Sequence, residues 1–181
     1  YYPKMKIIGN LSDWWVIRWA HAADLEFNDQ YPILYLNMAH LNIHQALTTP
    51  KDSLLKYNLN IANDYYGGSG LQYLKDYLGD DILDQSIKEF YAKNKLTPVK
   101  ISDFESFLST KTNLPIHWFF EEYADKRTRI DFKIKKVIKK GDSLEVIIKN
   151  KKDNKMPVSL YGLNGDEIVY KTWTQPFDSL V

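Results

Sequence analysis

The sequence contains no cysteine, which excludes disulfide bonds and thiolate chemistry and leaves the redox compartment undetermined. It also has no apolar run near the roughly 20 residues that a membrane-spanning helix needs. The opening segment, YYPKMKIIGN, lacks the basic start and apolar block of a signal peptide. Because the chain begins at Tyr1 rather than at an initiator methionine, we expect it to be cut from a longer protein. What is present is ample apolar content, 44% of the residues with 14% aromatic, which predicts a folded core rather than disorder.

The net charge of +1 at neutral pH conceals an uneven distribution of charge along the chain. Residues 1–125 carry 11 Lys or Arg and 16 Asp or Glu, whereas residues 126–181 carry 13 and 7. The net charge therefore changes from −5 to +6 at one point in the sequence. This change indicates two modules with different surfaces, which we place at residues 1–126 and 127–181.

Up to residue 126 the apolar residues recur with the period of an α-helix. Gly79 is a good C-terminal stop for one of these helices. Ser102 and Glu105 form a capping box at the start of another, and Pro115 occupies the first turn of a third. Helices are predicted within residues 11–27, 33–48, 68–79, 80–95, 101–113 and 115–125, with an irregular connector and one short helical turn at 49–64.

After residue 126 the period changes to two, which is typical of half-buried strands. Strands are predicted within residues 130–140, 143–150, 156–163 and 167–176, with tight turns at the KGD and NGD sequences between them. Four strands in hairpin order predict a small antiparallel sheet whose solvated face carries the lysines. The predicted fold class is therefore α+β, with an α-helical, bundle-like module followed by a small antiparallel four-stranded β module.

Histidine is scarce, so its positions are the first test for a metal site. His40 and His44 lie four residues apart, a spacing that places both imidazoles on one helix face. Zinc peptidases use that spacing with a glutamate after the first histidine, but Leu41 stands there and no third ligand is obvious. His21 and His117 stand alone. We therefore predict no metal site in this chain and expect His40 and His44 to cap or pack against a helix.

Other kinds of site receive little support from the sequence. Ser69 lies in a GSG triplet without the strand–turn–helix context of a nucleophile elbow. The run GGSG at 67–70 is not followed by the Lys-Ser/Thr pair of a phosphate loop. The lysines of the predicted strands alternate with apolar residues and lack interleaved exposed aromatics, which indicates a solvated face rather than a nucleic-acid partner.

The stretch 63-NDYYGGSGLQYLKDYLGDD-81 is the least ordinary part of the sequence, because it places Tyr65 and Tyr66 on a glycine-rich turn before an amphipathic helix. Two interpretations are open. The tyrosines seal the core at a helix entry, or one of them presents its hydroxyl to a substrate.

This stretch and the residues after it resemble a known family. The order is a Tyr-x-x-Gly turn, a helix that ends in LGDD at 78–81, the segment IKEFYAKNK at 87–95, a capping-box helix and HWFFEEY at 117–123. That order is similar to the C-terminal half of the catalytic domain in zinc aminopeptidases of the aminopeptidase N type, the gluzincins. The resemblance covers roughly residues 50–176, since the tail also resembles a β module that comes after this domain in some bacterial members. The family's HExxH motif and downstream glutamate ligand are missing here and, by family order, would lie upstream of Tyr1.

The resemblance implies a fragment of a zinc metallopeptidase, inactive by itself, whose zinc and remaining peptidase domain belong to a full-length parent. Tyr65, or alternatively Tyr66, would donate a hydrogen bond to the oxyanion that forms on a peptide carbonyl. Gly67 and Gly68 would let the backbone pass close to the peptide substrate. The sequence departs from the family where a lysine comes after the tyrosine, because Gly67 or Tyr66 stands at that position. The bacterial relatives imply an extracytoplasmic location.

A second hypothesis involves no catalytic ancestry. The chain would then be a non-catalytic binding or scaffold module whose basic β face docks a partner. An HExxH motif in the reading frame upstream, with a glutamate about eighteen residues later, would favour the peptidase hypothesis over this one.

Overall fold

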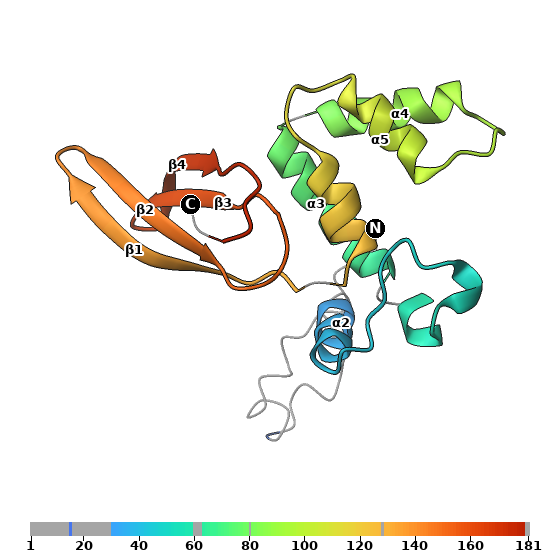
Figure 1. Cartoon of the computed structure of the whole chain (residues 1–181), viewed down its shortest axis with the longest axis horizontal. Coiled ribbons are helices and arrows are strands. Elements are labelled where there is room, and N and C mark those ends of the chain that lie inside the picture. Colours follow the sequence, from blue (N-terminus) through green and yellow to red (C-terminus); the bar gives the residue numbers. More distant parts are fainter. Residues whose placement is uncertain (1–14, 16–29, 60–62, 80, 128, 180–181) are drawn as a thin grey trace. The chain divides into compact units, whose positions relative to one another are not determined.

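The computed structural model describes residues 15, 30–59, 63–79, 81–127 and 129–179. It confirms the α+β class, with helices first and four antiparallel strands after them (Figure 1). The elements are α2 (Gln30–His40), η4 (Lys51–Ser53), α3 (Asn63–Leu78), α4 (Ile82–Lys93), α5 (Ile101–Ser109), η6 (Phe119–Asp125), β1 (Phe132–Lys140), β2 (Ser143–Asn150), β3 (Ser159–Asn164) and β4 (Glu167–Trp173). The helix predicted within residues 11–27 lies outside the described residues, apart from Trp15.

The chain divides into two compact units. The first comprises Tyr1–Gln45 and Pro50–Gly67, and the second comprises Ala46–Thr49 and Gly68–Val181. Helix α3 contributes residues to both, and the strands belong to the second unit together with α4 and α5. The predicted division at residues 126 and 127 stays a prediction.

In the first unit, α2 ends at His40, well before the end of the predicted segment at residue 48. The chain leaves the helix through Asn42, whose φ of 58° lies in the left-handed region that asparagine tolerates. The fully buried Asn58 then fixes the connector. Its amide Nδ2 donates to the Ile43 carbonyl at 3.0 Å and to Gln45 Oε1 at 2.9 Å, while its Oδ1 accepts the Gln45 backbone N–H at 3.2 Å. These long-range bonds outweigh the local helical pattern.

In the second unit, α3 buries Leu74, Tyr77 and Leu78 on one face and stops at Gly79, as predicted. Gly79 has a φ of 87°, which is why a residue without Cβ terminates the helix there.

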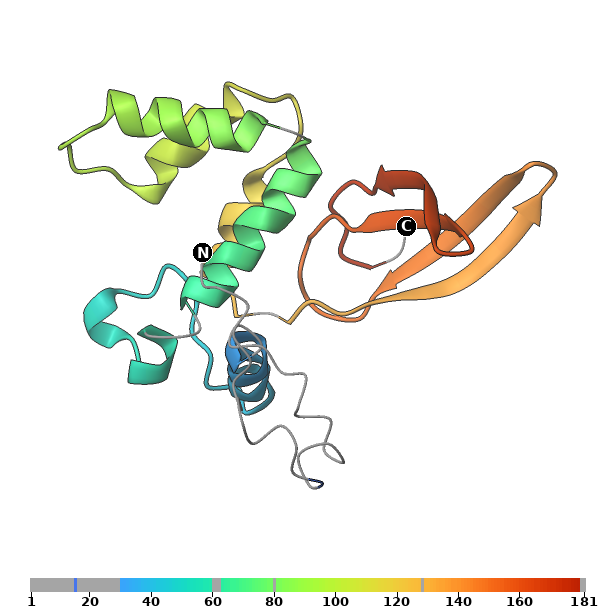
Figure 2. The same ribbon diagram turned by 180° about the vertical axis from the view of Figure 1, so that it is seen from behind.

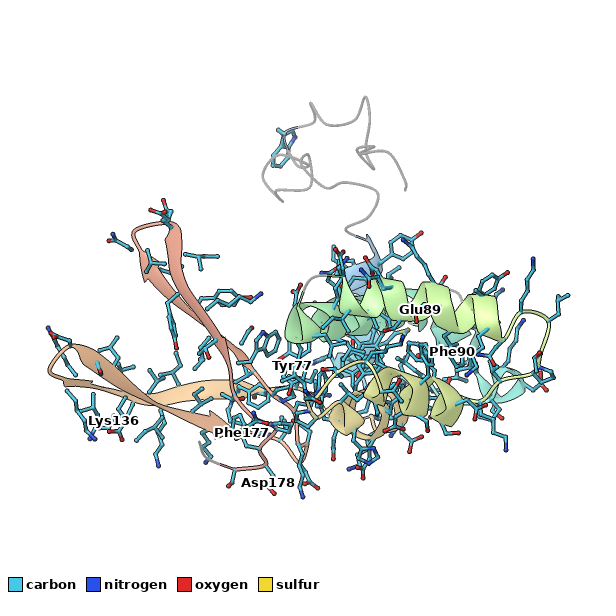
Figure 3. The ribbon with its side chains drawn as sticks, turned by 90° about the horizontal axis from the view of Figure 1, so that it is seen from above. Tyr77, Glu89, Phe90, Lys136, Phe177 and Asp178 are labelled. Carbon is cyan, nitrogen blue, oxygen red and sulfur yellow. The ribbon has the colours of Figure 1, made fainter. Side chains whose placement is uncertain are left out.

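Helices α4 and α5 lie side by side (Figure 1). Phe90 of α4, labelled in Figure 3, makes ring contacts with Phe104 at 5.2 Å and Phe107 at 5.5 Å between centroids. The predicted capping box at Ser102 and Glu105 is wrong by two residues. Asp103 Oδ2 accepts the backbone N–H of Lys100 at 2.7 Å, so the helix begins at Ile101.

The helix predicted at 115–125 forms as η6, a π-helix, which is a rare conformation. Its ring pair Phe119 and Tyr123 is stacked at 5.7 Å with an interplanar angle of 10°. The carbonyl of Ala124, near its C-terminal end, accepts the backbone N–H of Leu47 at 2.9 Å. Residues 46–49 are thereby held to the second unit.

The four strands form two antiparallel hairpins, β1–β2 and β3–β4, rather than the single sheet that the alternation suggested (Figure 2). The predicted KGD and NGD turns join them, with Gly141 at φ 60° and Gly165 at φ 62°. Each hairpin contains a bulge. Lys135 is the extra residue in β1, and Val169 is the extra residue in β4.

Four aromatic rings join the helices to the second hairpin. Tyr73 and Tyr77 of α3 each make edge-to-face contacts with both Trp118 and Trp173, with centroid distances between 5.1 and 5.8 Å. The Tyr73 hydroxyl also donates to the Pro157 carbonyl at 2.7 Å. We call these four residues the aromatic cage. It connects the helical and β parts of the second unit.

We predict that Tyr73→Phe lowers the free energy of unfolding by about 1–2 kcal/mol, because the buried Pro157 carbonyl loses its hydrogen-bond donor. Urea denaturation measures the change. The matched control is Tyr91→Phe, since Tyr91 is 68% exposed and its variant should differ by less than about 0.5 kcal/mol. Equal stability of the two variants would contradict the importance of this bond.

Two glycines of α3 give a second prediction. A Cβ at Gly70 would overlap the buried ring of Tyr123, whereas one at Gly68 would meet nothing within 4 Å. Gly70→Ala should therefore lower the free energy of unfolding by about 1–3 kcal/mol, through overpacking. Gly68→Ala should raise it by about 0.5–1 kcal/mol, because alanine is the better helix former. Thermal and urea melts of the pair test this, and effects of the same sign would refute it.

Candidate functional site

Tyr65 and Tyr66 lie in the first turns of α3, so the glycine bend that the sequence suggested is wrong. Gly67 and Gly68 are also helical. The helix runs through them because its 16 residues include the buried Leu74 and Leu78 further along, whose packing compensates for the low helix propensity of glycine. Gly68 has open space around it, and its proposed closeness to a substrate stays a prediction.

A third tyrosine lies against this pair. The ring of Tyr35, from α2, stacks on Tyr66 at 5.1 Å with an interplanar angle of 16°. It also lies 5.8 Å from Tyr65 at a tilt of 47°, and His44 touches its edge at 6.3 Å. We call Tyr35, Tyr65 and Tyr66 the tyrosine cluster. Nothing in the local sequence pattern pointed to Tyr35, so the sequence alone did not predict its part in the cluster.

The three phenols differ in burial. Tyr66 is only 9% exposed, and burial together with the neighbouring Tyr35 raises its pKa. Burial and the adjacent Tyr65 raise the pKa of Tyr35 to about 12. Both therefore stay protonated at neutral pH. Tyr65 is half-buried, and its ring lies against that of Tyr35. Of the two candidates that the sequence offered, Tyr65 is the more exposed residue.

His40 and His44 do not share a helix face, although their four-residue spacing predicted that they would. α2 ends at His40, which is exposed, and His44 lies beyond the turn at Asn42 and is 6% exposed. Among the described residues no three His, Asp or Glu side chains are grouped so that they could hold a metal ion. The zinc that the family resemblance implies therefore has no ligand set in this part of the chain.

His117, which seemed isolated in the sequence, lies between two carboxylates. Its Nδ1 is 2.6 Å from Glu105 Oε1 of α5, and its Nε2 is 3.0 Å from Glu121 Oε2 of η6. The hydrogen bond to Glu105 is the main cause that raises the His117 pKa, and Glu121 adds to it. His117 thus connects α5 to η6. The i, i+4 spacing of His117 and Glu121 is visible in the sequence. The contact with Glu105 is not, because the sequence pattern favours Glu105 as part of a helix cap.

Three buried polar atoms in the second unit have no hydrogen-bond partner among the described residues. They are Tyr77 OH, Trp118 Nε1 and Glu122 Oε2. The other Glu122 oxygen accepts from Lys126 Nζ at 2.8 Å. Two of the three atoms belong to the aromatic cage, so part of the stabilisation by its rings is offset by the cost of burying polar groups.

Comparison of the chain with protein-family models, with curated proteins and with solved structures found no match. Among the described residues, no helix combines the length and the apolar character that crossing a bilayer requires. The structure thus shows the α+β fold class.

We predict that stability falls as the pH rises above neutrality, because the His117 pKa is higher in the folded state than its usual 6.5. The contribution of protonated His117 is fully present below the unfolded-state pKa and is lost as the pH passes the raised, folded-state value. Urea midpoints between about pH 6 and pH 9 measure this loss. His117→Gln should remove this part of the pH dependence, and an unchanged profile would show that the carboxylate contacts contribute nothing.

Proposed function

We propose that this chain forms one wall of a peptidase site in which Tyr65 donates a hydrogen bond to the carbonyl oxygen of the scissile peptide bond. The observation that carries this proposal is the difference between the two adjacent tyrosines. Tyr66 is buried in a stack with Tyr35, whereas Tyr65 contacts the same ring at a tilt and is only half-buried. A ring that contacts a neighbouring ring while part of its side chain stays exposed suits a hydrogen-bond donor that must be positioned beforehand.

The chemistry of a phenol supports this role. A neutral O–H forms a hydrogen bond to a carbonyl oxygen that strengthens as negative charge develops on that oxygen. Tyr65 also belongs to the first turn of a 16-residue helix, where the partial positive charge of the helix terminus favours a nearby anion. Both contributions act more strongly on the tetrahedral intermediate than on the ground-state peptide, and this difference is what accelerates a reaction.

Two further assignments belong to the same proposal. Gly67 and Gly68 come directly after the two tyrosines and expose the helix backbone at a place where an extended peptide substrate would pass. The remainder of the peptidase domain, including the groups that activate the attacking water, would come from residues other than those described. No chemical step is assigned to a metal here, because the described residues offer no group of ligands for one.

The test uses the longest natural protein that contains this chain, with hydrolysis of aminoacyl-nitroanilide substrates as the assay. Tyr65→Phe should lower kcat about 100-fold or more, because one oxyanion donor is removed, and should leave KM nearly unchanged. Tyr66→Phe is the matched control, since its buried hydroxyl should affect stability but change kcat only a few-fold.

Unchanged turnover in Tyr65→Phe would remove Tyr65 from the site. Zinc bound stoichiometrically by the isolated 181-residue chain would separately overturn the assignment of the metal-bearing half to residues outside it.

A second function is favoured by the register of the first hairpin. The pairs Lys133–Lys149 and Lys136–Ile147 lie on the same face, because residues 147 and 149 are two apart on β2. Figure 3 shows Lys136 on this hairpin. A strand face that carries Lys133, Lys136 and Lys149 would bind an acidic partner. The chain would then be a non-catalytic docking module. If the tyrosine variants leave turnover unchanged, this function is the better account of the chain.

A further inference from the structure

The loop between α4 and α5, residues 94–100, carries a leucine that the fold does not explain. Leu96 is 98% exposed and has a φ of 64°, in the left-handed region. That conformation strains any residue with a Cβ, and a γ-branched apolar side chain does not relieve the strain by local hydrogen bonding as asparagine would. Among the described residues nothing packs on Leu96. The loop therefore holds a strained and almost fully exposed apolar side chain.

Leu96 is not an isolated apolar residue on this side of the unit. Tyr91, Val99 and Ile101 are 68%, 48% and 52% exposed. Behind them lies an open apolar hollow of about 340 Å³ whose walls come from α3, α4 and α5. Its lining residues are Leu71, Ile87, Phe90, Tyr91, Asn94, Val99 and Phe104. The loop shares Asn94 and Val99 with the lining of the hollow, whereas Leu96 is not among the lining residues.

Lysines surround this tip. Lys93, Lys95 and Lys100 are exposed and form no ion pair with any described residue. No acidic residue occurs between Phe90 and Ser102. The nearest carboxylates on either side are engaged, since Glu89 pairs with Lys111 and Asp103 accepts the Lys100 backbone N–H. The segment around Leu96, residues 91–101, therefore carries three lysines and no carboxylate of its own beside its exposed apolar side chains.

We propose that the loop of residues 94–100 docks on an anionic lipid surface, with Leu96 inserted at the boundary between headgroups and acyl chains. A protruding apolar side chain flanked by lysines matches that boundary, because the aliphatic part leaves water while the ammonium groups stay among the phosphates. Tyr91, with an apolar ring and a polar tip, suits the same depth. The proposal is independent of the role of Tyr65.

The shape of the surface favours a bilayer over an acidic peptide as the partner. A helical peptide would lie in the hollow and would be held by its lining side chains. Leu96 is almost completely exposed, so it points away from the hollow and would remain uncovered by such a peptide. A lipid surface covers a protruding tip from all sides without needing a complementary groove.

The absence of cysteine allows a direct test of insertion. Leu96→Cys, labelled with an environment-sensitive fluorophore, should show a blue shift on vesicles of phosphatidylcholine containing about a third phosphatidylglycerol, and no shift on phosphatidylcholine alone. The matched control is Leu163→Cys. Leu163 is also largely exposed, at 63%, but it lies on β3 in the β3–β4 hairpin, away from the loop in sequence. A blue shift at residue 163 and none at residue 96 would overturn the proposal.

Charge is tested with two triple variants. Lys93, Lys95 and Lys100 changed together to Gln should lower the vesicle partition coefficient about tenfold or more, and raised salt should weaken binding of the unaltered chain. The same change at Lys133, Lys136 and Lys149 removes an equal charge from the β1–β2 hairpin and should have the smaller effect. A larger effect of the hairpin variant would assign binding to that hairpin and refute the loop.

The variant Leu96→Gly serves as a control for folding. Glycine relieves the strain of the left-handed conformation, so this variant should unfold at a higher temperature. Because it lacks the apolar side chain, it should bind vesicles less well. Equal binding to neutral and anionic vesicles overturns the proposal. Failure to bind either kind of vesicle also overturns it. If the label at residue 96 then responds to a glutamate-rich helical peptide, the surface is a protein-docking site instead.

Discussion

The aromatic cage is the interaction on which the second unit depends. Tyr73 and Tyr77 are one helical turn apart, so their rings project from the same face of α3 and both reach Trp118 and Trp173. Edge-to-face pairs of this kind contribute about 0.5–1.5 kcal/mol each beyond the area that they bury. Because Trp118 precedes η6 and Trp173 ends β4, the cage ties together three segments that are distant in sequence. The bulk of Tyr123 beside Gly70 then sets how closely η6 approaches α3.

Features with a local chemical cause were predictable from the sequence. Gly79, the KGD turn and the NGD turn each need a residue at positive φ, and the structure has glycine there. Features that depend on distant partners were not predictable. The end of α2 is set by the hydrogen bonds of Asn58, and the start of α5 is set by a choice between Asp103 and Glu105 as the cap. Glu105 contacts His117 instead, twelve residues away, and no local pattern encodes that preference.

The candidate site shows the same limit. A doubled tyrosine beside glycines singled out residues 65 and 66, but the sequence could not say which of the two side chains is buried. That difference comes from Tyr35, whose ring stacks on one and only tilts against the other. Likewise, the glycine with a steric reason is Gly70 rather than Gly68, since only the former faces a buried ring. Residue type indicated the chemistry, and tertiary packing determined the geometry.

The bulges in the two hairpins bear on the behaviour of the protein at high concentration. Flat two-stranded ribbons with exposed Ile134, Val137 and Leu144 would be templates for the growth of fibrils. The extra residues Lys135 and Val169 bend and twist each ribbon, and Lys135 adds a charge at the point where a further strand would hydrogen-bond. The two bulges thereby oppose edge-to-edge pairing of the hairpins, and deletion of either extra residue would give a flatter ladder that pairs more readily.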